Sequence, residues 1–252
     1  MKVPPSDPSI SGSWFVPSQP NSDNSPRLFI FPYAGGGPAA FSKWSVEGIG
    51  IWTAHYPGRG SRYNEHLIKE LRILVERILQ AIQPVLDKPF AFYGHSMGGL
   101  VAFELTRQLR RQDLPQPQLL FISACGAPQM PDPHPPIHAL PEAEFIDSLK
   151  KLNGIPPEIL QNSEAMNILL PTARADFEAV ETYQYVSKGS PIDPPILTFG
   201  GLDDPRVSRE RLEGWATQTS SRFKSQYFPG DHFFINTSRQ AVIEAVSTEI
   251  NF

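Results

Sequence analysis

Short, almost wholly apolar runs recur along the chain, and glycine, proline or polar residues bound each of them. Runs of this kind are typical of strands that are buried on both faces of a parallel sheet. The predicted strands cover residues 14–16, 27–31, 49–55, 89–93, 119–123, 195–199 and 222–228.

Apolar residues recur at helical spacing between several of these runs. Leu71, Leu74 and Ile78 mark one face of an amphipathic helix expected over 68–82. Further helices are expected after Gly98, from Leu100 through about Arg111, and over 240–250. Strands that alternate with helices predict an α/β fold, with a mostly parallel central sheet and helices on both faces.

The segment between the strands at 119–123 and 195–199 breaks this alternation. It begins with a proline-rich stretch over 128–141 and continues with helix-like pieces over 142–152 and 164–185. An insertion of this length in a compact domain is usually functional. We expect a helical lid over 128–185, placed over the C-terminal edge of the sheet. It would lie within one α/β domain covering 1–252, whose first 25 residues form a loose leader.

Gly94-His-Ser-Met-Gly98 follows one predicted strand and begins a predicted helix. This context matches the Gly-x-Ser-x-Gly nucleophile elbow of the α/β-hydrolase fold. At the flanking glycines, a side chain would collide with the neighbouring strand or helix. The pattern predicts Ser96 as a catalytic nucleophile.

A serine nucleophile needs a base, and in this fold the order along the chain is nucleophile, acid, histidine. His232 lies after the 195–199 strand, in a loop expected between the 222–228 strand and the last helix. We therefore predict His232 as the base. His95 is adjacent to the nucleophile and points elsewhere, while His134 and His138 are expected to be solvated.

The acid is expected directly after the strand at 195–199. Asp203 and Asp204 both lie there, and Gly201, Asp204 and Val207 match the usual Gly-x-x-Asp-x-x-Val spacing. We favour Asp204 as the residue that orients His232, with Asp203 as the alternative. Asp231 is expected to cap its own loop.

The oxyanion hole requires backbone N–H donors that face the developing negative charge. Met97, which follows the nucleophile, should supply one of them. The loop after the strand at 27–31 should supply the other, from Ala34 or Tyr33. Its glycines at 35–37 suit close approach of a substrate to the backbone, but no Gly-Lys-Ser/Thr phosphate loop is present.

Composition narrows the possible classes of protein. The 252 residues carry a formal net charge of -4 without a basic cluster, which argues against nucleic-acid binding. No run reaches the length of a membrane span, and the start lacks the apolar core of a signal peptide. Cys125 is the single cysteine, and its side chain is expected to pack in the buried core. We expect a cytoplasmic, monomeric protein with no metal site and no cofactor of its own.

Several stretches together resemble the type II, or editing, thioesterases that accompany nonribosomal peptide and polyketide synthases. Pro57-Gly-Arg59 and Arg174-Ala-Asp-Phe177 are the most specific, because general hydrolases lack them. The full set of matching stretches is 31–37 with Phe41 and Trp44, 56–60 with Arg62 and Glu65, 92–99, 170–177 with Tyr183, 200–207 with Trp215, and 229–234.

The resemblance implies hydrolysis of acyl or aminoacyl thioesters stalled on the phosphopantetheine arm of an acyl or peptidyl carrier protein. Arg59, Arg62 and Arg174 are candidates for contact with that acidic partner or its phosphate, the alternative being structural ion pairs. The residues alone also permit a small-molecule carboxylesterase or an acyltransferase with the same triad. A non-catalytic carrier-protein binder is a remote alternative.

Overall fold

A computed structural model describes residues 14–18, 25–155, 157–187 and 189–250. Most of the expected leader, residues 1–13 and 19–24, lies outside the described residues. The strands of the sheet are β1 (Phe15–Pro17), β2 (Arg27–Phe31), β3 (Gly50–Ala54), β4 (Phe90–His95), β5 (Leu120–Ser123), β6 (Ile196–Gly201) and β7 (Phe223–Phe228). Every expected strand is present, and the bounds differ by at most two residues at either end.

The strands form one seven-stranded sheet in the order β1-β3-β2-β4-β5-β6-β7. All neighbouring strands run parallel except β1, which pairs with β3 in the antiparallel direction. The chain extends the sheet from β2 to β3 on one side and then crosses back to place β4 on the other side. The carboxyl ends of β2 and β4 therefore border a crevice, which is where ligands bind in open α/β sheets.

Each face of the sheet is covered, and β2, β4 and β5 are buried at nearly every position. In β2, Phe29 and Phe31 face the core under α2 (Leu71–Ile82) and α3 (Met97–Arg111), whereas Leu28 and Ile30 face the core under α9 (Arg239–Glu249). This period of two is the side-chain alternation of a strand. The two-layered core holds the carboxyl ends of the strands at one rigid edge.

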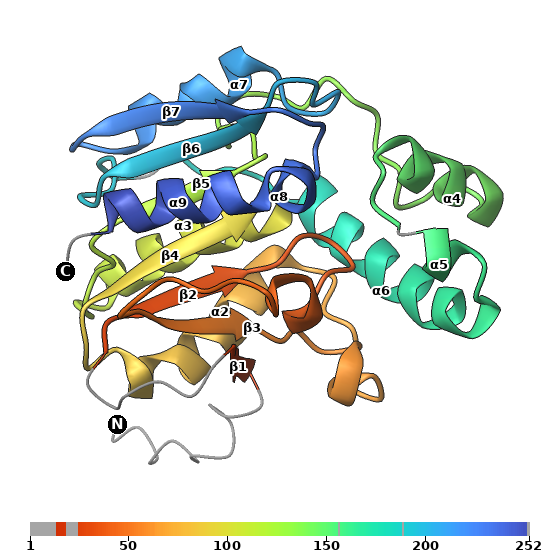
Figure 1. Cartoon of the computed structure of the whole chain (residues 1–252), viewed down its shortest axis with the longest axis horizontal. Helices are drawn as coiled ribbons and strands as arrows, with labels where there is room; N and C mark the ends of the chain where they lie inside the picture. Colours follow the sequence, from red (N-terminus) through yellow and green to blue (C-terminus); the bar gives the residue numbers. More distant parts are fainter. Residues whose placement is uncertain (1–13, 19–24, 156, 188, 251–252) are drawn as a thin grey trace.

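The insertion between β5 and β6 contains α4 (Glu142–Lys151), α5 (Pro157–Leu160) and α6 (Ser163–Glu181). Figure 1 shows these helices grouped beyond the arrowheads of β2 and β4, outside the sheet. They share a small apolar cluster that includes Ile137, Phe145, Leu149, Met166 and Leu170. A cluster of its own explains how this segment keeps its shape away from the main core.

The structure departs from the sequence-based predictions mainly at short helices and at the end of one longer helix. The short helices α5, α7 (Arg209–Glu213) and α8 (Phe234–Thr237) were not expected. α6 ends at Glu181, four residues before the end of the piece expected over 164–185, and it runs through Pro171 as that prediction required. Leu170 and Thr172 are buried on either side of Pro171, so packing holds the helix where proline removes a hydrogen bond. No helix within the described ranges is long and apolar enough to cross a membrane.

Candidate active site

The residues predicted to act together follow four different strands of the sheet. Ser96 follows β4, the loop with Tyr33 and Ala34 follows β2, Asp204 comes three residues after β6, and His232 comes four residues after β7. Because these strands are parallel, their carboxyl ends meet at one edge. The topology thus brings all of these residues to one edge of the sheet, and Figure 1 shows α4, α5 and α6 beyond the ends of β2 and β4 at that edge.

Ser96 occupies a sharp turn between β4 and α3, with φ 53° and ψ -118°. This is a strained conformation for a residue with a side chain. A Cβ at Gly94 would come within 2.1 Å of the Gly98 carbonyl oxygen, and one at Gly98 within 1.8 Å of the Phe31 carbonyl oxygen. The two glycines therefore permit the close packing of strand and helix that holds Ser96 at the sheet edge, as expected from the sequence.

A hydrogen-bonded chain joins Asp204, His232 and Ser96. The His232 Nδ1 atom lies 2.9 Å from Asp204 Oδ2, and its Nε2 atom lies 3.0 Å from Ser96 Oγ. A carboxylate can only accept, so Nδ1 carries the proton and Nε2 is left to accept the Ser96 hydroxyl proton. This is the tautomer that a general base next to a serine requires.

The backbone around Asp204 explains why this aspartate, and not Asp203, reaches the histidine. Its Oδ1 atom accepts hydrogen bonds from the N–H groups of Arg206 and Val207, at 2.8 Å and 3.2 Å, which turns Oδ2 toward His232. Asp203 is exposed. A Cβ at Gly201 would lie 2.2 Å from the Asp231 carbonyl oxygen, so this glycine allows the histidine loop to pack closely.

The loop after β2 forms a turn in which the Gly36 N–H donates to the Tyr33 carbonyl oxygen at 2.8 Å. Gly35 has φ 75°, the left-handed value that the third residue of a type II turn needs. Its N–H donates to Asp176 Oδ2 at 2.7 Å. With the Gly35 and Gly36 amides in use, Ala34 and Tyr33 remain the candidate donors on this loop. Met97 is the first residue of α3, and its N–H has no acceptor within the helix.

A cavity of about 470 Å³ lies between this edge and the inserted helices. Ser96 and His232 line it on the sheet side, together with the Tyr33–Gly37 loop. The wall from the insertion is largely aliphatic and includes Leu149, Ile155 and Leu169. The cavity therefore accommodates an apolar group whose reactive end lies against Ser96.

His95 and Cys125, which the sequence analysis set aside as base and nucleophile, have structural roles. His95 is fully buried, and its Nδ1 atom lies 2.8 Å from Ser123 Oγ and not against Ser96. Cys125 is buried behind Gly99, and burial raises the pKa of its thiol to about 12. A thiol with that pKa stays protonated and is no nucleophile.

His95 should make the protein less stable in mild acid. Burial, and then the neighbouring His232, hold the pKa of His95 well below its ordinary value. The unfolded chain then takes up a proton that the folded chain does not. The free energy of unfolding should fall below about pH 6.5, with up to about 1.4 kcal/mol per pH unit from this residue. His55, whose pKa is also lowered by burial, adds a loss of the same sign.

Urea unfolding at pH 7.5, 6.5 and 5.5 checks this expectation. His95→Gln should flatten the decline, whereas His66→Gln, which changes an exposed histidine, is the matched control. A variant at position 95 that keeps the full decline would contradict the assignment.

The candidate arginines for partner contact are all engaged within the chain. Arg59 is buried and paired with Asp176 at 2.7 Å. Arg62 is buried and binds Glu65 at 2.6 Å. Arg174 donates to the carbonyl oxygens of His138 and Leu140. The alternative of structural ion pairs and hydrogen bonds therefore describes them better than contact with a phosphate.

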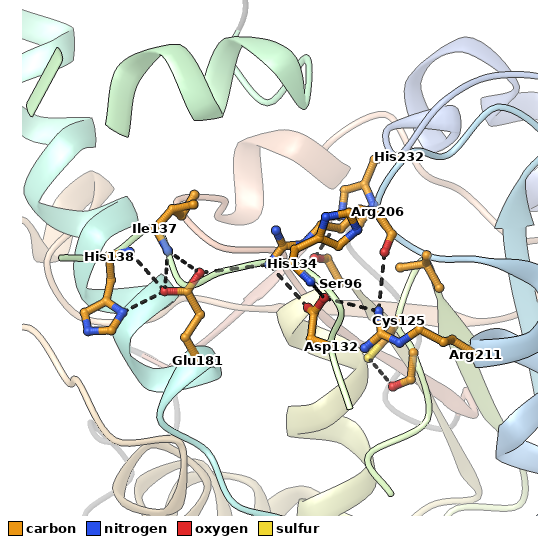
Figure 2. A network of polar contacts seen from close by, with 12 residues as sticks. Ser96, Cys125, Asp132, His134, Ile137, His138, Glu181, Arg206, Arg211 and His232 are labelled. Carbon is orange, nitrogen blue, oxygen red and sulfur yellow. Dashed lines mark hydrogen bonds and ion pairs between the residues drawn. The ribbon is translucent and has the colours of Figure 1, made fainter. Parts of the chain in front are cut away.

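The expectation that His138 is solvated is wrong. Its Nδ1 atom lies 2.7 Å from Glu181 Oε2, and Glu181 also accepts from the Ile137 and His138 amides. Figure 2 shows this group with Arg206, which lies 3.3 Å from Asp132 and two residues after Asp204. These contacts tie the start of the insertion to the end of α6. Asp231 caps its loop as expected, since its Oδ1 atom accepts from the Phe233 N–H.

The sequence-based reasoning missed Asp176, although it lies inside the Arg174-Ala-Asp-Phe177 motif. Within this motif Arg174 was the candidate for contact with an acidic partner, and no local pattern shows that Asp176 turns toward the Gly35 amide. A buried aspartate on an otherwise apolar helix face was the available signal. No group of side chains suited to holding a metal ion occurs in the described part of the chain.

Comparison with known proteins agrees with the resemblance to thioesterases found in the sequence. The family model described as "Thioesterase domain" matches residues 26–250. The gramicidin S biosynthesis protein GrsT of Aneurinibacillus migulanus is 42% identical over 94% of this chain and 93% of its own length. The RedJ thioesterase of the prodiginine pathway in Streptomyces coelicolor superposes with a TM-score of 0.84 at 30% identity, covering 92% of this chain and 95% of that one. For YbtT, titled a type II thioesterase from the yersiniabactin NRPS/PKS pathway, the TM-score is 0.82 at 29% identity, over 92% and 96%.

The seven-stranded sheet and the serine at its elbow define an α/β-hydrolase. Within that class, the chain belongs to the thioesterase family. The resemblance inferred from the sequence motifs is confirmed.

Proposed function

We propose that this protein is an editing thioesterase, which hydrolyses acyl or aminoacyl thioesters stalled on carrier proteins of nonribosomal peptide or polyketide synthesis. The observation that carries the proposal is the hydrogen-bonded Ser96–His232–Asp204 chain at the wall of an apolar cavity. The similarity to GrsT and YbtT over nearly the whole chain supports the substrate class.

In the proposed reaction, His232 Nε2 takes the Ser96 proton as Ser96 Oγ attacks the thioester carbonyl carbon. The tetrahedral intermediate then expels the pantetheine sulfur, which leaves as a thiol with the proton from His232. A water molecule, deprotonated by His232, then attacks the acyl-enzyme carbonyl. The bond to Ser96 Oγ breaks, His232 returns the proton to Ser96, and the carboxylic acid is released. Asp204 holds His232 in the required tautomer and stabilises its cationic form.

The developing oxyanion would accept hydrogen bonds from Met97 and from the loop after β2. Ala34 is the better second donor of the two candidates, because it immediately precedes the Gly35 amide that Asp176 holds. Tyr33 is the alternative. Donors that are fixed before the reaction stabilise the transition state without reorganisation.

The insertion over 128–185 would act as a lid that closes over the acyl group and excludes water. An aliphatic wall on α4 to α6 suits this task, since the cavity lies beneath them. The carrier protein would present its substrate on the pantetheine arm, and the chain needs no cofactor of its own. A single domain over 1–252, a monomeric state and a cytoplasmic location stay predictions.

Release of acetyl or aminoacyl groups from a loaded carrier protein tests the proposal. Wild type should cleave the carrier-bound thioester with a much higher kcat/KM than the same acyl group on free pantetheine. The reason is that the docked carrier adds binding energy that the free arm lacks. Both reactions should depend on Ser96.

Ser96→Ala, measured in parallel, is the control for background thioester hydrolysis. Equal or faster cleavage of free small esters would leave the serine hydrolase chemistry standing and make the protein a general carboxylesterase. Transfer of the acyl group to an added amine or alcohol in place of water would instead indicate an acyltransferase.

A further inference from the structure

Two motifs that the reaction does not use meet in the structure. Arg59 comes from the loop after β3, and Asp176 lies on α6, which belongs to the insertion. Their side chains form a two-pronged ion pair, with Nη1–Oδ2 at 2.7 Å and Nη2–Oδ1 at 2.8 Å. Both are buried, with 9% and 4% of the side chains exposed.

The same pair holds the turn that carries the candidate oxyanion donor. Asp176 Oδ2 accepts the Gly35 N–H at 2.7 Å, and Arg59 Nη1 donates to the Gly36 carbonyl oxygen at 2.8 Å. Glycines allow a loop many conformations. The first bond holds the Ala34–Gly35 peptide plane and the second holds the Gly36–Gly37 plane, so the turn is fixed at both ends of its glycines.

The insertion also packs directly on this turn. A Cβ at Gly35 would lie 3.1 Å from Leu169 and 3.3 Å from Ala173. Both residues are on α6, and with Asp176 they follow the spacing of one helix face. Any displacement of this part of α6 would therefore displace Gly35.

Stability alone is a weak reason for such a pair. Removing two charges from water costs about as much as their attraction returns, and apolar residues of similar volume often stabilise a protein equally well or better. What an apolar pair lacks is a donor and an acceptor for the turn.

We propose that Arg59 and Asp176 are positioning residues for the hydrolysis reaction. They hold the Ala34 amide in place opposite Met97 and make the oxyanion hole depend on the position of α6. This inference rests on the proposed acyl transfer at Ser96, and it concerns the transition state and not the binding of the acyl group.

The test compares two double variants on an activated small ester, p-nitrophenyl butyrate, which needs no carrier protein. Arg59→Met with Asp176→Leu removes both bonds to the turn without leaving a buried charge unpaired. We expect kcat to fall about 100-fold, as for a misplaced catalytic group, with KM changed less than about threefold. Arg59→Met with Asp176→Asn restores an acceptor for the Gly35 N–H and should recover part of kcat.

Glu65→Gln is the matched control. It weakens the Arg62–Glu65 pair, which lies on the same loop but makes no contact with the turn. It should leave kcat unchanged. Thermal unfolding of every variant shows whether the fold is retained.

The outcomes separate this inference from the proposed function. The positioning role alone would be overturned if the folded variant with Arg59→Met and Asp176→Leu kept the wild-type kcat, or if only its KM changed. It would also be overturned if the variant with Arg59→Met and Asp176→Asn recovered no kcat. Unfolding of both double variants would assign the pair to stability and would also overturn it. Ester cleavage by Ser96→Ala at the wild-type rate would overturn the proposed function together with this inference.

Discussion

Ser96→Ala is expected to abolish acyl-enzyme formation and to lower kcat by a factor on the order of 10⁶, as loss of the nucleophile does in other serine hydrolases. The substitution removes the atom that is proposed to attack the thioester. Ser96 Oγ lies 3.0 Å from His232 Nε2, and no other hydroxyl shares that histidine among the described residues. The fold should persist, since loss of one hydroxyl changes the free energy of unfolding by about 0.5 kcal/mol or less.

Two measurements check this expectation. A serine-directed fluorophosphonate should label wild type and leave Ser96→Ala unlabelled, and thermal unfolding should give closely similar midpoints for both. Ser42→Ala, at an exposed serine, is the matched control and should be labelled like wild type. Undiminished labelling of Ser96→Ala would refute the nucleophile assignment.

Asp204→Asn is expected to lower kcat by about 10⁴-fold, the size of the effect in a well-studied serine protease. Oδ1 of residue 204 accepts two backbone N–H groups, so an asparagine keeps its oxygen there. Its NH₂ group must then face His232 Nδ1. That nitrogen becomes an acceptor, and the proton moves to Nε2, which can no longer accept the proton of Ser96.

Asp203→Asn is the matched control, because it makes the same chemical change at the adjacent, exposed residue. Its rate constant for single-turnover hydrolysis of the loaded carrier should stay near that of wild type. A large loss in Asp203→Asn with little change in Asp204→Asn would reverse the assignment of the acid.

Most of the regular structure could be predicted from the sequence. The apolar run at 27–31 and the helical spacing of Leu71, Leu74 and Ile78 correspond to β2 and α2 within three residues. Patterns of this length report directly on which face of an element is buried. The short helices α5 and α7 could not be predicted in this way. So short a helix has little stability of its own and forms only where tertiary contacts support it.

Local motifs of the candidate site could be predicted from the sequence, whereas contacts between distant residues could not. Ser96 lies in a local strand–turn–helix motif whose glycines are readable in the sequence. The solvated state expected for His138 was wrong, because its partner Glu181 is 43 residues away along the chain. The sequence left open whether Arg59 contacts a phosphate or a structural partner, and in the structure its guanidinium pairs with Asp176.

The sequence by itself determined the elements of this protein and the chemistry available at their ends. The elements follow from the period of apolar positions, and the turn at Ser96 follows from its flanking glycines, which are local features. The residues available at the ends of the strands follow from the order of Ser96, Asp204 and His232 along the chain. Only the tertiary structure decided which side chains meet. Arg59 and Asp176 are separated by 117 residues, and their pairing depends on how α6 packs against the sheet edge. Asp203 and Asp204 differ by one position, yet only one carboxylate faces His232, because the backbone bonds of Arg206 and Val207 set its direction.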